Sequence, residues 1–194
     1  NERDDPGVDL VNDLERDDYT IYLIEEPEPA TAPKDGVKLA ATPIRFQYPD
    51  GAHNCEALGI DAVTGKFYLV TKVKRGNPCA AYELTTTLAD PDAQVPFTAV
   101  KLADLAIPTV IAMDISPDGR RAIVLTKSGA LEYSRAVDAT WAQAFAGEPR
   151  ALTVPRGIQS EAICYGADGA SLFLTSETGK KEPAPPCPLF EMPA

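Results

Sequence analysis

Seven polar residues lie at the ends of three similar stretches of the chain, and they are the best candidates for binding a ligand. Acids begin two of these stretches, at Glu56 and Glu161, and charged residues follow the ends of all three. A group of acids, lysines and amides can bind a cation or a polar small molecule. The candidate site consists of His53, Glu56, Lys72, Lys127, Gln159, Glu161 and Glu177. The alternative is that the acids only pair with lysines or with backbone amides.

Common catalytic chemistries find no support in the residue types. His53 is the only histidine, whereas zinc catalysis normally needs several His or Cys ligands. A Ser-His-Asp hydrolase would have to use His53, and no Gly-x-Ser-x-Gly elbow is present to hold the serine. The chain also lacks a phosphate-binding loop and a dinucleotide-binding glycine motif. We therefore assign no catalytic residue.

Calcium is the one cofactor that the sequence suggests, through an acidic N-terminal stretch. Asp4, Asp5 and Asp9 are weak candidate ligands, because calcium is bound by clustered carboxylate oxygens. Their spacing does not match an EF-hand loop, and a solvated acidic loop is the alternative interpretation.

The elements that would position the candidate site form a repeat. The stretches 56–71, 111–126 and 161–175 each contain an apolar run, a turn that closes on Gly65, Gly119 or Gly169, and a second apolar run. A turn glycine between two apolar runs predicts a β-hairpin.

Two further strands accompany each hairpin. A third strand is predicted at 82–84, 131–133 and 190–192, and a fourth at 44–48, 97–102 and 151–154. Four strands in a unit of about fifty residues are typical of a β-propeller blade. We therefore predict an all-β fold made of antiparallel four-stranded blades. A strand at 19–24, a break at Pro43 and a short helix within 136–146 complete the prediction.

The predicted blades divide the chain into four parts. Residues 1–48 hold the acidic loop and the two outer strands of an incomplete blade, 49–102 and 103–155 are complete blades, and 156–194 is a last blade without its outer strand. Unpaired strand edges are avoided in folded proteins. We therefore expect the remaining blades to come from a preceding segment or a second chain, with the final outer strand supplied by the N-terminal end. A closed four-bladed ring of these residues alone is the alternative.

Charge and hydropathy exclude two classes of partner. The formal net charge is −11 and the sequence pI is about 4.5, so we expect neither nucleic acid nor an anionic membrane surface as a partner. No apolar run approaches the roughly 20 residues that a membrane span needs.

The four cysteines predict two disulfides. Cys79 and Cys187 occupy the same place before the third strand of their units, and Cys55 and Cys164 lie at or within the first strands. We predict the pairs Cys55–Cys79 and Cys164–Cys187, each of which would add about 3 kcal/mol in the loop-entropy treatment. Disulfides indicate an oxidising compartment and hence a secreted or extracellular protein.

The motifs resemble those of a group of secreted bacterial β-propeller proteins. Residues 56–72 are similar to the hairpin motif EAL-x-VD-x-x-TG-x-LY-x-VTK of that group. Residues 114–121 match DISPDGRR, 159–177 match Q-x-EAI…DG-x-x-L-x-x-(T/V)SE, and 19–29 match a YT-x-Y…PEP strand. The resemblance implies a propeller of which roughly the first half precedes this chain, and it transfers no catalytic residue. A weaker likeness is to phytase-like propellers, whose metal clusters do not map onto this chain.

Two functions follow from this reading. The first is an extracellular binding or structural scaffold module, which presents its channel mouth or its loops to a protein, a glycan or a small ligand. The alternative is a calcium-assisted phosphoesterase or related hydrolase of the phytase-like kind.

Overall fold

The fold is almost entirely β-structure, as the repeat predicts. The structure is a computed structural model that describes residues 19–26, 38–73, 78–87, 96–107, 109–155, 159–177 and 186–194. These residues form thirteen strands and one short helix. Within this part of the chain, no helix has the length and apolar character to cross a membrane.

Three sheets contain the strands. The first has the order β1-β2-β6-β5-β4-β3, with β1 (Tyr19–Ile24), β2 (Ala41–Gln47), β3 (Cys55–Asp61), β4 (Lys66–Thr71), β5 (Cys79–Thr87) and β6 (Phe97–Leu105). The second has the order β10-β9-β8-β7, with β7 (Val110–Ile115), β8 (Arg121–Thr126), β9 (Gly129–Ser134) and β10 (Arg150–Leu152). The third is β11 (Gln159–Tyr165), β12 (Ser171–Glu177) and β13 (Leu189–Pro193).

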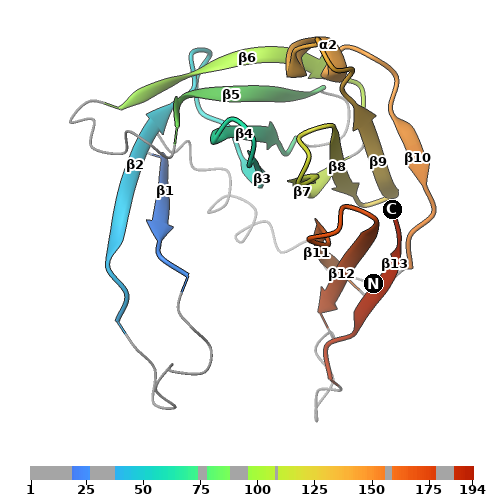
Figure 1. The fold of residues 1–194 in the computed structure, drawn as a ribbon. Coiled ribbons are helices and arrows are strands. Elements are labelled where there is room, and N and C mark those ends of the chain that lie inside the picture. Colours follow the sequence, from blue (N-terminus) through green and yellow to red (C-terminus); the bar gives the residue numbers. More distant parts are fainter. Residues whose placement is uncertain are drawn as a thin grey trace, which may run out of the picture.

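The sheets are arranged as consecutive blades of a β-propeller. Figure 1 shows them in an open arc, with β3, β7 and β11 on the inner side and β6, β10 and β13 on the outer side. The inner strands lie next to one another, β3 beside β7 and β7 beside β11. Within β3–β6, β7–β10 and β11–β13, sequential strands pair antiparallel.

The inner hairpins form because glycine allows the backbone to turn sharply. Gly65, Gly119 and Gly169 have φ values of 70°, 66° and 67°, in the left-handed region that other residues avoid. The three predicted hairpins are confirmed at these positions.

The second strands of the first two inner hairpins, β4 and β8, hold neighbouring sheets together. Alternate side chains of a strand point to opposite faces, and the middle strand β8 is buried on both faces. Ala122 and Val124 pack against the first sheet, whereas Ile123 and Leu125 pack against the third. The strand β4 is also buried on both faces: one face packs against the β1–β2 hairpin and the other against the second sheet. An apolar run without alternation is therefore the sequence signature of a strand between two sheets.

The β1–β2 hairpin differs from the prediction in two ways. Pro43 does not break the strand: it lies within β2 and pairs with Tyr22. Proline lacks an N–H and fits where a strand has a free edge, and β6 pairs with β2 only at Phe46 and Gln47. The second difference is this parallel pairing, which joins the β1–β2 hairpin to β6, the outer strand of the next blade.

The one helix among the described residues lies within the predicted range 136–146 and spans five residues of it. α2 (Trp141–Phe145) begins after Thr140, whose side chain accepts from the backbone N–H of Gln143, while the Gln143 side chain accepts from the backbone of Thr140. This reciprocal capping box fixes the start of the helix. Trp141, Ala144 and Phe145 are buried between the first two sheets.

Alanine at two turn glycines tests how closely the first two sheets approach. A Cβ atom on Gly119 would lie 2.9 Å from Asp61 Oδ1, whereas the nearest atom to one on Gly169 would be 3.7 Å away. Because φ is nearly equal at both sites, Gly169→Ala should cost about 1–2 kcal/mol for the backbone alone. Gly119→Ala should cost at least about 1 kcal/mol more, from steric overlap. Urea unfolding followed by Trp141 fluorescence measures both, and equal losses would contradict the close approach.

Candidate functional site

The inner strands share an irregularity at the end where the candidate ligand-binding residues lie. Each begins with a β-bulge, which places one extra residue between Cys55 and Ala57, between Val110 and Ala112, and between Ser160 and Ala162. A bulge re-aims its extra side chain. The extra residues are Glu56, Ile111 and Glu161.

Charged residues at the ends of the second strands lie opposite these bulges. Lys72, Lys127 and Glu177 occupy equivalent positions, each directly after a buried hydroxyl residue: Thr71, Thr126 or Ser176. These hydroxyls contact the backbone nearby; Thr126 Oγ1, for example, donates to the Gly129 carbonyl at 2.8 Å. These hydrogen bonds fix the backbone at the ends of the inner hairpins, from which the charged side chains project.

Six of the seven predicted site residues lie at this end. Lys72 Nζ is 2.5 Å from Glu56 Oε2 in an ion pair whose side chains are 25% and 40% exposed. Lys127 and Glu177 are exposed, and Glu161 is half-buried with interactions of its own. Gln159 begins β11, paired with Glu177. We define this set, Glu56, Lys72, Lys127, Gln159, Glu161 and Glu177, as the inner-strand end.

His53 is the exception, because its side chain packs toward the outer strands. Its Nε2 lies 2.9 Å from Asp50 Oδ1 and 3.2 Å from the Tyr82 hydroxyl on β5. The ring also lies edge-on to Tyr48, after β2. Tyr19 holds the His53 backbone at both its N–H and its carbonyl, at 2.7 and 2.9 Å. His53 therefore anchors the β1–β2 hairpin to the β3–β6 sheet.

Asp50 accepts hydrogen bonds in the same cluster. Burial raises its pKa, but the hydrogen bonds from His53 and Tyr82 outweigh burial and keep the pKa below its ordinary value of 3.8. A carboxylate whose pKa falls on folding stabilises the fold above the ordinary pKa, and this stabilisation is lost as the pH falls through the lower folded value.

Asp50→Asn should therefore destabilise the protein at neutral pH, and the difference from the wild type should vanish at a pH well below 3.8. Urea midpoints at both pH values measure this difference. Asp138→Asn, at an exposed aspartate outside the cluster, is the control and should behave alike at both pH values. A deficit of the Asp50→Asn variant that persists in acid would contradict the assignment.

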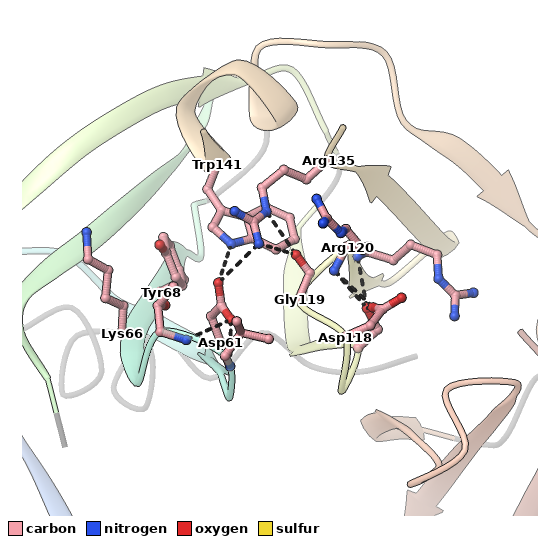
Figure 2. A network of polar contacts seen from close by, with 12 residues as sticks. Asp61, Lys66, Tyr68, Asp118, Gly119, Arg120, Arg135 and Trp141 are labelled. Atoms are coloured by element: carbon pink, nitrogen blue, oxygen red, sulfur yellow. Dashed lines mark hydrogen bonds and ion pairs between the residues drawn. The ribbon is translucent and has the colours of Figure 1, made fainter. Parts of the chain in front are cut away.

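The buried Asp61 lies at the opposite end of β3. Figure 2 shows Trp141, at the start of α2, and Arg135, just after β9, pointing at this carboxylate. Trp141 Nε1 donates to Oδ2 at 3.1 Å, and Arg135 lies 3.5 Å from the same oxygen. The other oxygen, Oδ1, accepts from the backbone N–H groups of Val63 and Thr64. Arg135 also donates to the Gly119 carbonyl and lies over the Trp141 ring.

A second buried acid joins the second and third sheets. Glu132 is 3% exposed. Its Oε2 accepts from Arg150 at 2.7 Å, and its Oε1 accepts from the Tyr165 hydroxyl at 2.9 Å, with Arg121 3.6 Å away. Burial, and then the Glu132 charge, raise the pKa of Tyr165, so this hydroxyl remains a donor. Asp61 and Glu132 have their donors within the protein and serve as contacts between sheets.

The two predicted disulfides are not formed: none of the four cysteines is bonded to another. Cys55 begins β3 and Cys79 begins β5, with β4 between these strands. Cys164 lies in β11 and Cys187 two residues before β13, with β12 between these strands. Strands two apart are separated by about 9–10 Å, beyond the roughly 7 Å between Cα atoms that a disulfide tolerates. Cys55 and Cys79 also pack into different apolar clusters.

The proposed calcium ligands Asp4, Asp5 and Asp9 lie outside the described residues. Within the described ranges, no group of three or more His, Cys, Asp or Glu side chains is arranged to hold a metal ion.

Comparison with known proteins gives general structural similarity only. No known protein family matches the sequence, and no curated protein does so. Among solved structures, TolB from Acinetobacter baumannii is 15% identical and has a TM-score of 0.45, over 88% of this chain and 37% of that one. A 6-phosphogluconolactonase-like protein from Bacteroides uniformis is 18% identical with a TM-score of 0.45, over 84% of this chain and 50% of that one. The chain thus spans at most half the length of these two proteins.

Proposed function

We propose that this chain is part of an extracellular β-propeller scaffold that binds a protein, a glycan or a small polar ligand at the inner-strand end. The observation that carries the proposal is the bulge repeated in β3, β7 and β11, which aims the side chain of an extra residue at the same end of each sheet. The buried hydroxyls behind Lys72, Lys127 and Glu177 keep this surface rigid, which lowers the entropy cost of binding.

The chemistry of the surface favours binding over hydrolysis. Glu56 is paired with Lys72, which leaves it less available as a metal ligand. Exposed charges of both signs, at Lys127 and Glu177, suit a polar ligand with several hydrogen-bonding groups, such as a glycan. The extracellular location is supported only by the resemblance to secreted propellers, since the disulfides that also favoured it are not formed.

A glycan array probed with the purified chain tests the proposal. We expect selective binding that is lost in the double variant Lys72→Glu/Lys127→Glu and kept in Lys38→Glu, an exposed lysine outside the inner-strand end. Hydrolysis of p-nitrophenyl phosphate that stops on adding a chelator would overturn the proposal in favour of a metal-assisted esterase. Equal binding by all variants would also overturn it.

We further propose that additional blades, from a preceding segment or a second chain, cover the end faces of the arc. Phe173 and Thr175 on β12 occupy the positions that Ile123 and Leu125 occupy on β8. The two β8 residues are buried against the third sheet, whereas Phe173 is half-buried and Thr175 is exposed. Native mass spectrometry of the protein from its source should show a species heavier than 20.7 kDa. A stable monomer of this mass would contradict it.

A further inference from the structure

The outer edge of β13 in the third sheet corresponds to the outer edge of β9 in the second sheet. The edge of β9 is covered by β10. In the second sheet, β10 pairs antiparallel with β9, so that Arg150 lies opposite Glu132 and Leu152 opposite Ala130. In the third sheet, β13 is the outermost strand that the described residues contain. The sequence of β10, which pairs with β9, therefore indicates which kind of strand β13 can bind.

The registers of the two sheets identify the equivalent residues. Glu132 pairs with Ile123 on β8, and Glu191 pairs with Phe173 on β12. Ile123 and Phe173 occupy the same position relative to the bulges of their hairpins. Glu191 is therefore the counterpart of Glu132, and Leu189 is the counterpart of Ala130.

These equivalent residues have opposite environments. Glu132 is buried, with Arg150 from the outer strand and Arg121 from its own sheet beside it. Glu191 is exposed, and Ser171 stands at the position of Arg121. Ala130 is 1% exposed, whereas Leu189 is 67% exposed. The third sheet thus presents an acid and an apolar side chain at a strand edge, with no arginine of its own at the position that Arg121 occupies.

We propose that the outer edge of β13 binds an extended basic strand by β-sheet addition. The strand runs antiparallel to β13, with a lysine or arginine opposite Glu191 and, two residues later, an apolar side chain opposite Leu189. This is the pattern of Arg150-Ala151-Leu152 on β9. Backbone hydrogen bonds supply affinity, and the paired charge fixes the register. The inference rests on the proposal that further strands complete the sheets, and it adds the chemistry of the strand that occupies this edge.

A labelled peptide of residues 148–154, which contains Arg150-Ala151-Leu152, is the probe, and its fluorescence anisotropy is measured against the purified chain. We expect saturable binding that weakens at least about tenfold in the Glu191→Lys variant, the range of a charge-assisted hydrogen bond. A peptide with glutamate in place of Arg150 should show the reverse preference and bind the Glu191→Lys variant more tightly. Asp138→Lys, at an exposed aspartate outside the third sheet and outside the inner-strand end, is the control and should change neither affinity.

Three results would overturn the inference. One is no binding, or binding that is insensitive to charge at Glu191. Another is undiminished binding of a peptide methylated on its backbone nitrogens, which would indicate ionic contact without strand pairing. The third is self-association of the chain that Glu191→Lys abolishes, which would make a second copy the occupant. The glycan array does not depend on Glu191, so failure here leaves the scaffold proposal standing.

Discussion

Replacing Asp61 with alanine should lower the free energy of unfolding by about 3–5 kcal/mol, the cost of removing one partner from a buried ion pair. The side chain is fully buried, and its loss leaves Trp141 Nε1 and the Val63 N–H without their acceptor. Arg135 and the Thr64 N–H each lose one acceptor and keep a backbone carbonyl. Water cannot readily replace a carboxylate at this depth, so the donors keep most of their desolvation cost.

Asp168→Ala is the matched control for this prediction. Asp168 Oδ1 also accepts two backbone N–H groups of a hairpin turn, those of Ala170 and Ser171. It is exposed, and its side chain bonds these two N–H groups and the Ser171 hydroxyl, without the buried arginine and tryptophan donors of Asp61. The loss should be about 0.5–1.5 kcal/mol, that of ordinary hydrogen bonds. Equal losses for the two variants would mean that the contact between sheets adds nothing.

A double-mutant cycle with Trp141→Phe isolates the part that joins the sheets. The phenylalanine keeps most of the packing against Tyr68 and Phe145 and removes the indole N–H. The two substitutions should be less than additive, with a coupling of about 1–3 kcal/mol. Because Trp141 is the only tryptophan, unfolding of this cycle is followed by far-UV circular dichroism.

The hairpin repeat could be predicted from sequence because its signals are local. A turn glycine and two flanking apolar runs lie within about sixteen residues of one another, and both strand pairing and burial follow from them. The equivalence of Glu83, Glu132 and Glu191 was also visible as an acid between large apolar residues. What the sequence did not show was that Glu132 is buried and Glu191 exposed, because this depends on Arg150 and Tyr165, which are distant along the chain.

The predictions for the disulfides and for His53 were wrong because they depended on how the strands are ordered in space. The disulfide prediction compared places along the chain and did not count the intervening strand, although Cys55 is separated from Cys79 by β4. The position of His53 next to β3 suggested the inner-strand end, but Asp50 and Tyr82 draw its side chain the other way. Asp61 gave no signal beyond that of a turn residue, since its partners Arg135 and Trp141 lie more than seventy positions later.

Replacing Glu132 with alanine should be the second most damaging change, with a loss of about 3–4 kcal/mol. The Glu132 carboxylate contacts three side chains: Arg150 on the outer strand, Arg121 on the inner hairpin and Tyr165 on the next sheet. Arg150 is 56% exposed at its side chain and can turn to solvent, but Arg121 is only 27% exposed. We therefore expect the cost to lie in the lower part of the range for a broken buried ion pair.

Glu191→Ala is the internal control, because it removes the same side chain from the equivalent, exposed position of the third sheet. Its effect should stay within about 0.5 kcal/mol. A cycle of Glu132→Ala with Tyr165→Phe then measures the hydrogen bond between sheets, with an expected coupling of about 1–3 kcal/mol. A loss at Glu191 as large as that at Glu132 would mean that the acid stabilises its own sheet, whereas the predicted difference places the stabilisation in the contact with the next blade.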